Sequence, residues 1–137
     1  MKIFRILIAG VVVTVFSTIV GGLTCGSTFN WVYKVEPTNV WKPMDAPPGP
    51  VFMLLALILN IILVIVYALI QKGIPGKKKI IKGIMFGLIV WAVGTLPGML
   101  STYSFMNVAD TVVIYWTILG LVQFPLMGII IAFIYGD

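Results

Sequence analysis

The residues of this sequence that are best placed for chemistry carry no charge. Asn60 and Gln123 each lie near the middle of a long apolar run. Tyr67 follows Asn60 by seven residues, which puts both on one face of a helix. Pro125 has no N–H and leaves a backbone carbonyl unbonded beside Gln123. We therefore expect Asn60, Tyr67, Gln123 and Pro125 to line a site or pathway for a small neutral or amphipathic solute.

The two amides also have a structural interpretation. In lipid, Asn and Gln side chains hydrogen-bond across helix contacts, at a measured average of about 0.6 kcal/mol. Asn60 and Gln123 would then hold helices together, or fix the register of an oligomer. The sequence leaves both interpretations open.

Groups that catalysis or metal binding would need are absent from the apolar runs. No run contains Asp, Glu, Lys, Arg or His, and the whole chain has no His and one Cys. General acid–base catalysis needs a group that titrates near the working pH. Zinc, haem and iron–sulfur sites need sets of ligands that we do not find. We predict that the protein is not an enzyme and has no catalytic residue, cofactor or metal site.

The elements that must position these residues are four charge-free runs. They cover residues 6–23, 51–70, 83–100 and 111–135. The chain is 61% hydrophobic and 9% charged, against about 45–50% and 25% in soluble proteins. Each run can cross a hydrocarbon core of about 30 Å as a helix, and lipid requires such runs to be helical. We predict an all-α polytopic membrane protein whose single domain, residues 1–137, is a bundle of four transmembrane helices.

Two outer turns of the chain resemble each other. "GLTCGSTFN" (residues 22–30) and "GTLPGMLSTYSFMN" (94–107) both begin with Gly-x-x-x-Gly and end in Asn. Each is followed by a run with one central amide. The bundle could thus consist of two duplicated hairpins in parallel repeat, an arrangement known in transporters. Chance similarity explains the pattern equally well, because such residues are common at membrane interfaces.

The basic residues are distributed unevenly along the chain. Seven of the nine lie before the first run or in the link between the second and third runs, residues 71–82. The positive-inside rule places both termini and this link in the cytoplasm of a cell whose (inner) membrane the chain crosses. The net charge of +5 then needs no nucleic acid to explain it. We expect anionic lipid headgroups to bind the link at Lys77, Lys78, Lys79 and Lys82.

The first run has the outline of a signal peptide, but we expect it to remain as a helix. Its 18 residues exceed the usual apolar core of a signal peptide, about 7–15 residues. It also carries a ridge of small side chains, which lets membrane helices approach closely. The ridge consists of Gly10, Thr14, Thr18, Gly22 and Gly26. Cys25 beside it is interpreted as a small packing residue, since no histidine could activate its thiol.

The outer loop, residues 27–50, contains four aromatic residues and five prolines. Aromatic residues next to a span usually form an interfacial belt. A loop of this length can also serve as a lid over the bundle.

The C-terminal half resembles a family of small four-span prokaryotic membrane proteins classed as a domain of unknown function. The similarity rests on Gly83, Gly87 and Trp91 at four-residue spacing, on Tyr103 and Phe105, and on a last run with Gly128 in Ile-rich sequence. The resemblance implies the four-span architecture and no activity.

Two classes of function remain. The first is uncoupled permeation or binding of a small neutral or amphipathic solute. The second is a non-catalytic accessory or assembly subunit that packs against another membrane protein. In both cases we expect a homo-oligomer or a membrane-protein partner, because four helices filled with apolar side chains scarcely enclose a pathway alone.

Overall fold

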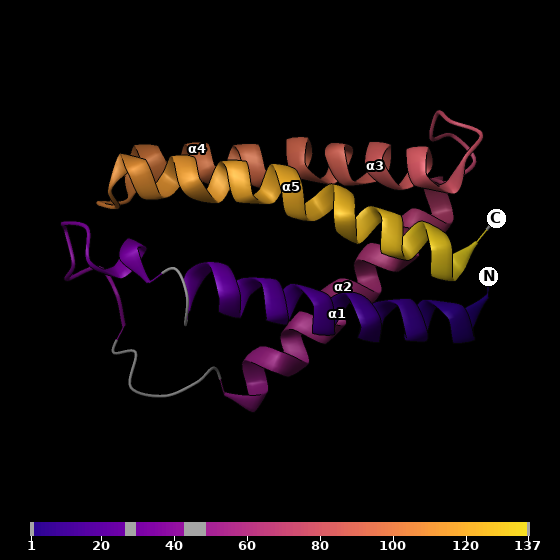
Figure 1. Cartoon of the computed structure of the whole chain (residues 1–137), viewed down its shortest axis with the longest axis horizontal. Coiled ribbons are helices and arrows are strands. Elements are labelled where there is room, and N and C mark those ends of the chain that lie inside the picture. Colours follow the sequence, from indigo (N-terminus) through magenta and orange to yellow (C-terminus); the bar gives the residue numbers. More distant parts are fainter. Residues whose placement is uncertain (1, 27–29, 43–48, 137) are drawn as a thin grey trace.

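The computed structural model describes residues 2–26, 30–42 and 49–136, and it is built from helices. The helices long and apolar enough to cross a membrane are α1 (Ile3–Cys25), α2 (Pro50–Ile70), the span Lys79–Phe105 and α5 (Asp110–Tyr135). They pack as a bundle (Figure 1). The predicted all-α, four-span fold is therefore confirmed. Two helices begin before the predicted charge-free runs: α1 includes Arg5, and the third span includes Lys79 and Lys82.

The third span changes its winding near the middle. It consists of α3 (Lys79–Val90), a π-helical turn η2 (Trp91–Thr95) and α4 (Leu96–Phe105). The N–H of Leu96 bonds the carbonyl of Trp91, five residues earlier. Pro97 follows at once and has no N–H to give to an α-helical turn. The helix nevertheless continues beyond this proline to Phe105.

Glycines bring the third span and α5 into backbone contact. A Cβ atom on Gly83 would lie 2.5 Å from the Cα of Ile129. Gly87 and Gly128 are packed at least as closely, against the Pro125 backbone and the Gly83 carbonyl respectively. Small residues at four-residue spacing allow this approach between membrane helices.

The buried core lies in the half of the bundle near the chain termini. Tyr67 of α2 is fully buried there, with its ring 5.1 Å from that of Phe86 and 6.1 Å from that of Tyr135. All four spans contribute to this core. Its fully or almost fully buried members include Ala9, Val13, Val64, Tyr67, Phe86, Ile131 and Ala132.

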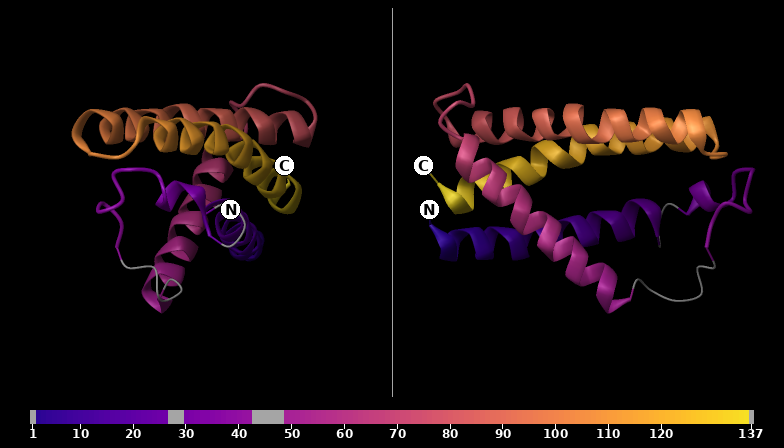
Figure 2. Two further views of the ribbon diagram at one scale, coloured as in Figure 1. Left: turned by 60° about the vertical axis from the view of Figure 1, so that its left-hand side comes forward. Right: turned by 180° about the vertical axis from the view of Figure 1, so that it is seen from behind.

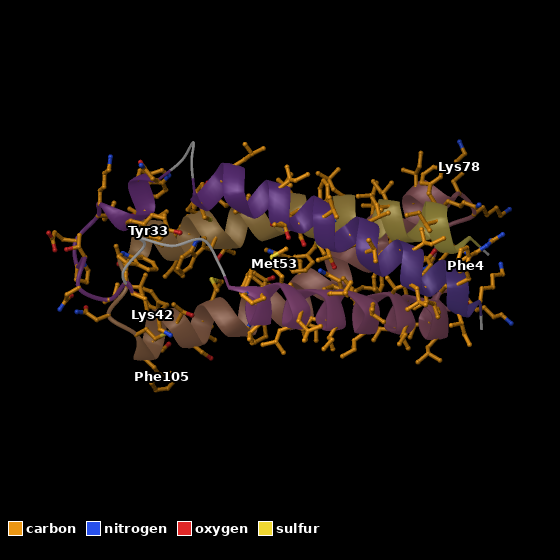
Figure 3. The ribbon with its side chains drawn as sticks, turned by 90° about the horizontal axis from the view of Figure 1, so that it is seen from below. Phe4, Tyr33, Lys42, Met53, Lys78 and Phe105 are labelled. Carbon is orange, nitrogen blue, oxygen red and sulfur yellow. The ribbon has the colours of Figure 1, made fainter. Side chains whose placement is uncertain are left out.

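The two ends of the bundle differ. The end where α1 begins, α5 ends and the link after α2 turns is called the lysine-bearing end; the opposite end is called the aromatic end (Figure 1). Phe4 and Lys78 lie at the first, and Tyr33, Lys42 and Phe105 at the second (Figure 3). Helices α1 and α5 lie close together at the lysine-bearing end and diverge toward the aromatic end, while α2 crosses α1 obliquely (Figure 2). The first hairpin, α1 and α2, therefore separates toward the aromatic end, whereas the second hairpin, the third span and α5, stays packed together there.

Candidate functional site: a cleft between α1 and α2

A cleft of about 530 Å³ lies between α1 and α2 on the side of the aromatic end. Its lining is mostly small or apolar, with a few hydroxyl groups and one thiol. The lining residues are Ser17, Thr18, Gly21, Gly22, Cys25 and Gly26 of α1, Phe52 and Ala56 of α2, and Tyr33 of the short 3-10 helix η1 (Trp31–Tyr33).

A hydrogen-bonded cluster centred on Asn60 lies next to the cleft and includes the lining residue Ser17. The Nδ2 of Asn60 donates to Thr14 Oγ1 at 3.1 Å and to Ser17 Oγ at 3.5 Å. The Thr14 hydroxyl donates in turn to the Gly10 carbonyl at 2.7 Å, so its oxygen is left to accept from the amide. One helical turn further toward the lysine-bearing end, Gly10 packs against Ile61, where a Cβ would lie 2.6 Å from Cγ1. Asn60 therefore marks the point where the two helices stop touching and begin to separate.

The α1 wall is the outer half of the small-residue ridge. Toward the lysine-bearing end, Gly10 and Thr14 contact α2 directly. Toward the aromatic end, Thr18, Gly22 and Gly26 line the cleft instead. A Cβ added to Gly22 would meet nothing within 4 Å. One ridge thus serves as a helix contact over half its length and as a cleft wall over the other half.

The α2 wall follows from helical spacing. Phe52, Ala56 and Asn60 recur every four residues and share one helix face. The sequence analysis identified Asn60 but missed Phe52 and Ala56. Their spacing from Asn60 is the signal that could have found them, because whatever faces Asn60 on α1 must also face the residues one and two turns earlier.

Aromatic contacts hold the rim of the cleft. The Trp31 ring lies 5.0 Å from that of Tyr115, and the Tyr115 hydroxyl donates to the Thr24 carbonyl at 2.7 Å. Tyr33 packs edge-on against Trp41 at 5.2 Å. These contacts attach residues 30–42 to α5, and α5 in turn to the end of α1. Within the predicted outer loop, residues 27–29 and 43–48 lie outside the described chain, so the lid stays a prediction.

Tyr33 is a neutral polar group at this rim. Burial raises the pKa of its phenol above the ordinary value of 10.0, and the neighbouring Cys25 raises it further. Burial disfavours the charged phenolate, and a nearby thiolate would repel it. The phenol therefore stays protonated over the physiological range.

The four predicted site residues occupy separate places. Asn60 hydrogen-bonds the cleft-lining residue Ser17, and Tyr67 is buried in the core against Phe86. Pro125 contacts α3 through its backbone at Gly87. Gln123 of α5 is half-buried, and within the described chain its side chain has no hydrogen bond. None of these four residues lines the cleft itself, and Asn60 contacts it through its hydrogen bond to the lining residue Ser17.

The link lysines predicted to bind lipid lie at the lysine-bearing end. Lys78 precedes α3, and Lys79 and Lys82 lie in its first turn. Lys77 is exposed in the link itself.

In residues 2–26, 30–42 and 49–136 no three His, Cys, Asp or Glu residues are grouped so that they could hold a metal ion. No protein-family model, curated protein or solved structure matches this chain. The resemblance to a four-span family therefore stays a prediction, and the function has to be argued from the cleft.

Proposed function

We propose that this protein binds a mostly apolar, amphipathic molecule that enters the α1–α2 cleft sideways from the lipid. The cleft itself carries this proposal. Its volume of about 530 Å³ lies within the range of small-molecule sites, about 300–1,000 Å³, and its few polar groups are set in apolar walls. The multi-span architecture supplies the membrane setting.

The lining favours an occupant with an apolar body and a polar end. Phe52 and Ala56 face the glycines of α1, which offer flat contact to a hydrocarbon chain or ring system. Tyr33 and Cys25 lie toward the aromatic end, where a polar group of the occupant could hydrogen-bond to the phenol. Ser17 contributes less, since its hydroxyl donates to the Thr14 carbonyl at 3.1 Å.

Binding is a better proposal than permeation. The Asn60 cluster lies beside the lining residue Ser17 at the middle of α2, where Asn60 is the eleventh of 21 residues. Beyond it the space is filled by Val13, Val64 and Tyr67, each fully buried. A path through the bundle would have to displace these side chains.

The orientation belongs to the same proposal. Under the positive-inside rule the lysine-bearing end lies in the cytoplasm. The cleft then opens into the outer half of the bilayer, where it could receive a molecule from the outer leaflet.

Native mass spectrometry of gently extracted protein tests the proposal, with two matched glycine variants. Gly22→Leu puts a large side chain into the cleft. Gly98→Leu makes the same change in α4, at an open position that does not line the cleft. We expect wild type and Gly98→Leu to retain a reproducible non-protein mass, and Gly22→Leu to lose it. Equal retention in all three proteins, or no bound mass in wild type, would refute the proposal.

The accessory-subunit function is supported by a different observation. Gly94 and Gly98 form a Gly-x-x-x-Gly pair that runs from the π-helical turn η2 into α4, and a Cβ on either would meet nothing within 4 Å. In membranes such pairs commonly pack against another helix. If the chain is an accessory subunit or an oligomer, Gly98→Leu should release a protein partner or a second copy and Gly22→Leu should not. A bare monomer in both variants and in wild type would exclude this function.

A further inference from the structure

Cationic side chains from two separate spans meet at the end of α5. Arg5 of α1 donates from Nη1 to the carbonyl of Tyr135, the last residue of α5, at 3.1 Å. Gly136, with φ of +74°, ends the helix in a conformation that favours glycine. A Cβ built there would lie 3.0 Å from Arg5 Nη1 and 3.8 Å from Lys79 Nζ. The two cationic groups therefore lie within 3.8 Å of one point.

These cations have unused donors. An arginine side chain carries five N–H donors in a planar fork. Within the described residues the Arg5 side chain donates one hydrogen bond, to the Tyr135 carbonyl. The Lys79 side chain makes no hydrogen bond or ion pair within the described residues. Lys2 adds a third positive charge close by, with Nζ 5.7 Å from the centre of the Tyr135 ring.

The described part of the chain supplies no acid at this end. Its two acidic residues are Glu36 in the segment 30–42 and Asp110 at the start of α5, both toward the aromatic end. Asp137 follows Gly136 in the sequence and lies outside the described residues. Like charges this close repel each other, so an anion that binds between them gains attraction from both.

We propose that the phosphate of an anionic phospholipid binds between Arg5 and Lys79. Arginine can grip two phosphate oxygens at once, and lysine adds a point charge. Both residues lie in the first turns of their helices, at the depth where a spanning helix meets the headgroups. Basic pockets between membrane helices are known to bind such headgroups.

The bound phosphate would join two parts of the bundle. Helix α1 packs on α2 and α5, whereas α3 packs on α5. A phosphate held by both Arg5 and Lys79 would link the first hairpin to the second across the end of α5. The site thus differs from a diffuse attraction between lipid and the link, in which each lysine contributes alike.

The test is a titration of the purified full chain in neutral detergent with phosphatidylglycerol, followed by native mass spectrometry. We expect Arg5→Gln and Lys79→Gln each to weaken binding about fivefold, and Lys77→Gln, an equal loss of charge in the link, to weaken it less than about twofold. Arg5→Lys keeps the charge but loses the two-point grip, so it should fall between wild type and Arg5→Gln. Lys79→Gln breaks no side-chain hydrogen bond within the described residues. We therefore expect this variant to fold normally, so that weaker lipid binding reports the loss of the charge itself.

Two further titrations, with phosphatidylcholine and with inorganic phosphate, identify the source of the phosphate. Phosphatidylcholine, which has no net charge, should bind at least about fivefold more weakly than phosphatidylglycerol. Inorganic phosphate at millimolar concentration should not displace the lipid, because it lacks the acyl chains that hold a headgroup at the interface. Displacement by inorganic phosphate would assign the site to a free anion and overturn the lipid proposal. Equal losses in the Lys77, Lys79 and Arg5 variants would overturn the discrete site.

Asp137 provides an internal check. If its carboxylate competes for the same cations, Asp137→Asn should strengthen phosphatidylglycerol binding, and the gain should vanish in an Arg5→Gln background. If Asp137→Asn still strengthens phosphatidylglycerol binding when Arg5 is replaced by Gln, the lipid binds elsewhere and the proposal is wrong.

Discussion

The backbone of Pro125 lies directly against Gly87, closer than any side chain on Gly87 would permit. Gly83 and Gly128 repeat this contact one turn away, so α3 and α5 touch through their main chains. A proline within a span invites a functional interpretation, because it frees a carbonyl. Here its position is explained by packing, since the residue lies in a backbone contact between α3 and α5.

This contact predicts an unequal response to the same substitution. Gly87→Ala should destabilise the fold by about 1–3 kcal/mol, because the added methyl group has no room between the two backbones. Gly98→Ala should be neutral or stabilising by up to about 1 kcal/mol, because its methyl group meets open space and alanine favours helix. Unfolding in mixed micelles measures both. Equal effects would contradict a backbone contact between α3 and α5 that persists in a lipid-like solvent.

The two intramembrane amides should also respond differently. Asn60→Leu removes two hydrogen bonds between α1 and α2, and we expect it to destabilise the protein by about 0.6–1.7 kcal/mol. Gln123→Leu removes no hydrogen bond of the described chain and should be neutral or stabilising. Unfolding free energies of the two variants test this, and a larger loss for Gln123→Leu would contradict it.

A double-mutant cycle can attribute the Asn60 effect to its partner. Thr14→Val removes the 3.1 Å acceptor and keeps the shape of the side chain. Because both single variants break the same hydrogen bond, their effects should sum to more than that of the double variant, by about 0.5–1 kcal/mol. Strict additivity would show that Asn60 acts through other contacts.

Cys25 is the only thiol in the chain and lies in the cleft wall, so it reports on the cleft without an engineered label. In membranes, Gly22→Leu should slow its reaction with a small maleimide several-fold, because the new side chain fills the space beside it. Gly98→Leu should leave the rate unchanged. A rate insensitive to Gly22→Leu would mean that the reagent reaches Cys25 by another route.

Tyr33 at the rim makes the occupancy of the cleft sensitive to alkaline pH. Burial and Cys25 raise the Tyr33 pKa above 10.0, so the phenol is neutral below that pH in both folded and unfolded chains. Its ionisation therefore costs stability only as the pH rises past 10 and through the folded-state pKa. We expect occupancy of the cleft, followed by native mass spectrometry, to be constant from pH 7 to about pH 9.5. Tyr33→Phe should remove any loss found above pH 10, and a loss that remains would assign the titration to another group.

The spans could be predicted because lipid imposes a strict rule on the backbone. A charge-free run of this length has to be helical there, so all four spans follow from composition. Their ends could not be placed as well, because the helices extend beyond the charge-free runs and include Arg5, Lys79 and Lys82. The π-turn at Trp91 was also missed. The turn begins at Trp91, whose Nε1 donates to the Thr117 carbonyl of α5 at 2.9 Å, and a contact between residues so far apart in the chain has no signal in local spacing.

The cleft could not be predicted for a related reason. The four-residue spacing of the α1 ridge indicates a close helix contact but not how far that contact extends. Its length depends on the angle at which α2 crosses α1, which is set by Gly10 against Ile61 and by core packing around Tyr67. Tyr33 reaches the rim only through the aromatic contacts of residues 30–42, and these have no regular spacing in the sequence.

The divergence of α1 and α5 gives the molecule a taper along the membrane normal (Figure 2). The bundle is therefore wider between α1 and α5 at the aromatic end than at the lysine-bearing end, and in a membrane that it spans the wider end would lie in one leaflet. Closing the cleft would shrink that larger footprint, so lateral pressure in the surrounding leaflet works against the open shape. Tighter lipid packing on that side should therefore lower the affinity for an occupant of the cleft, and looser packing should raise it. If the cleft binds an occupant as proposed, the shape of this bundle would couple that binding to the mechanical state of the bilayer around it.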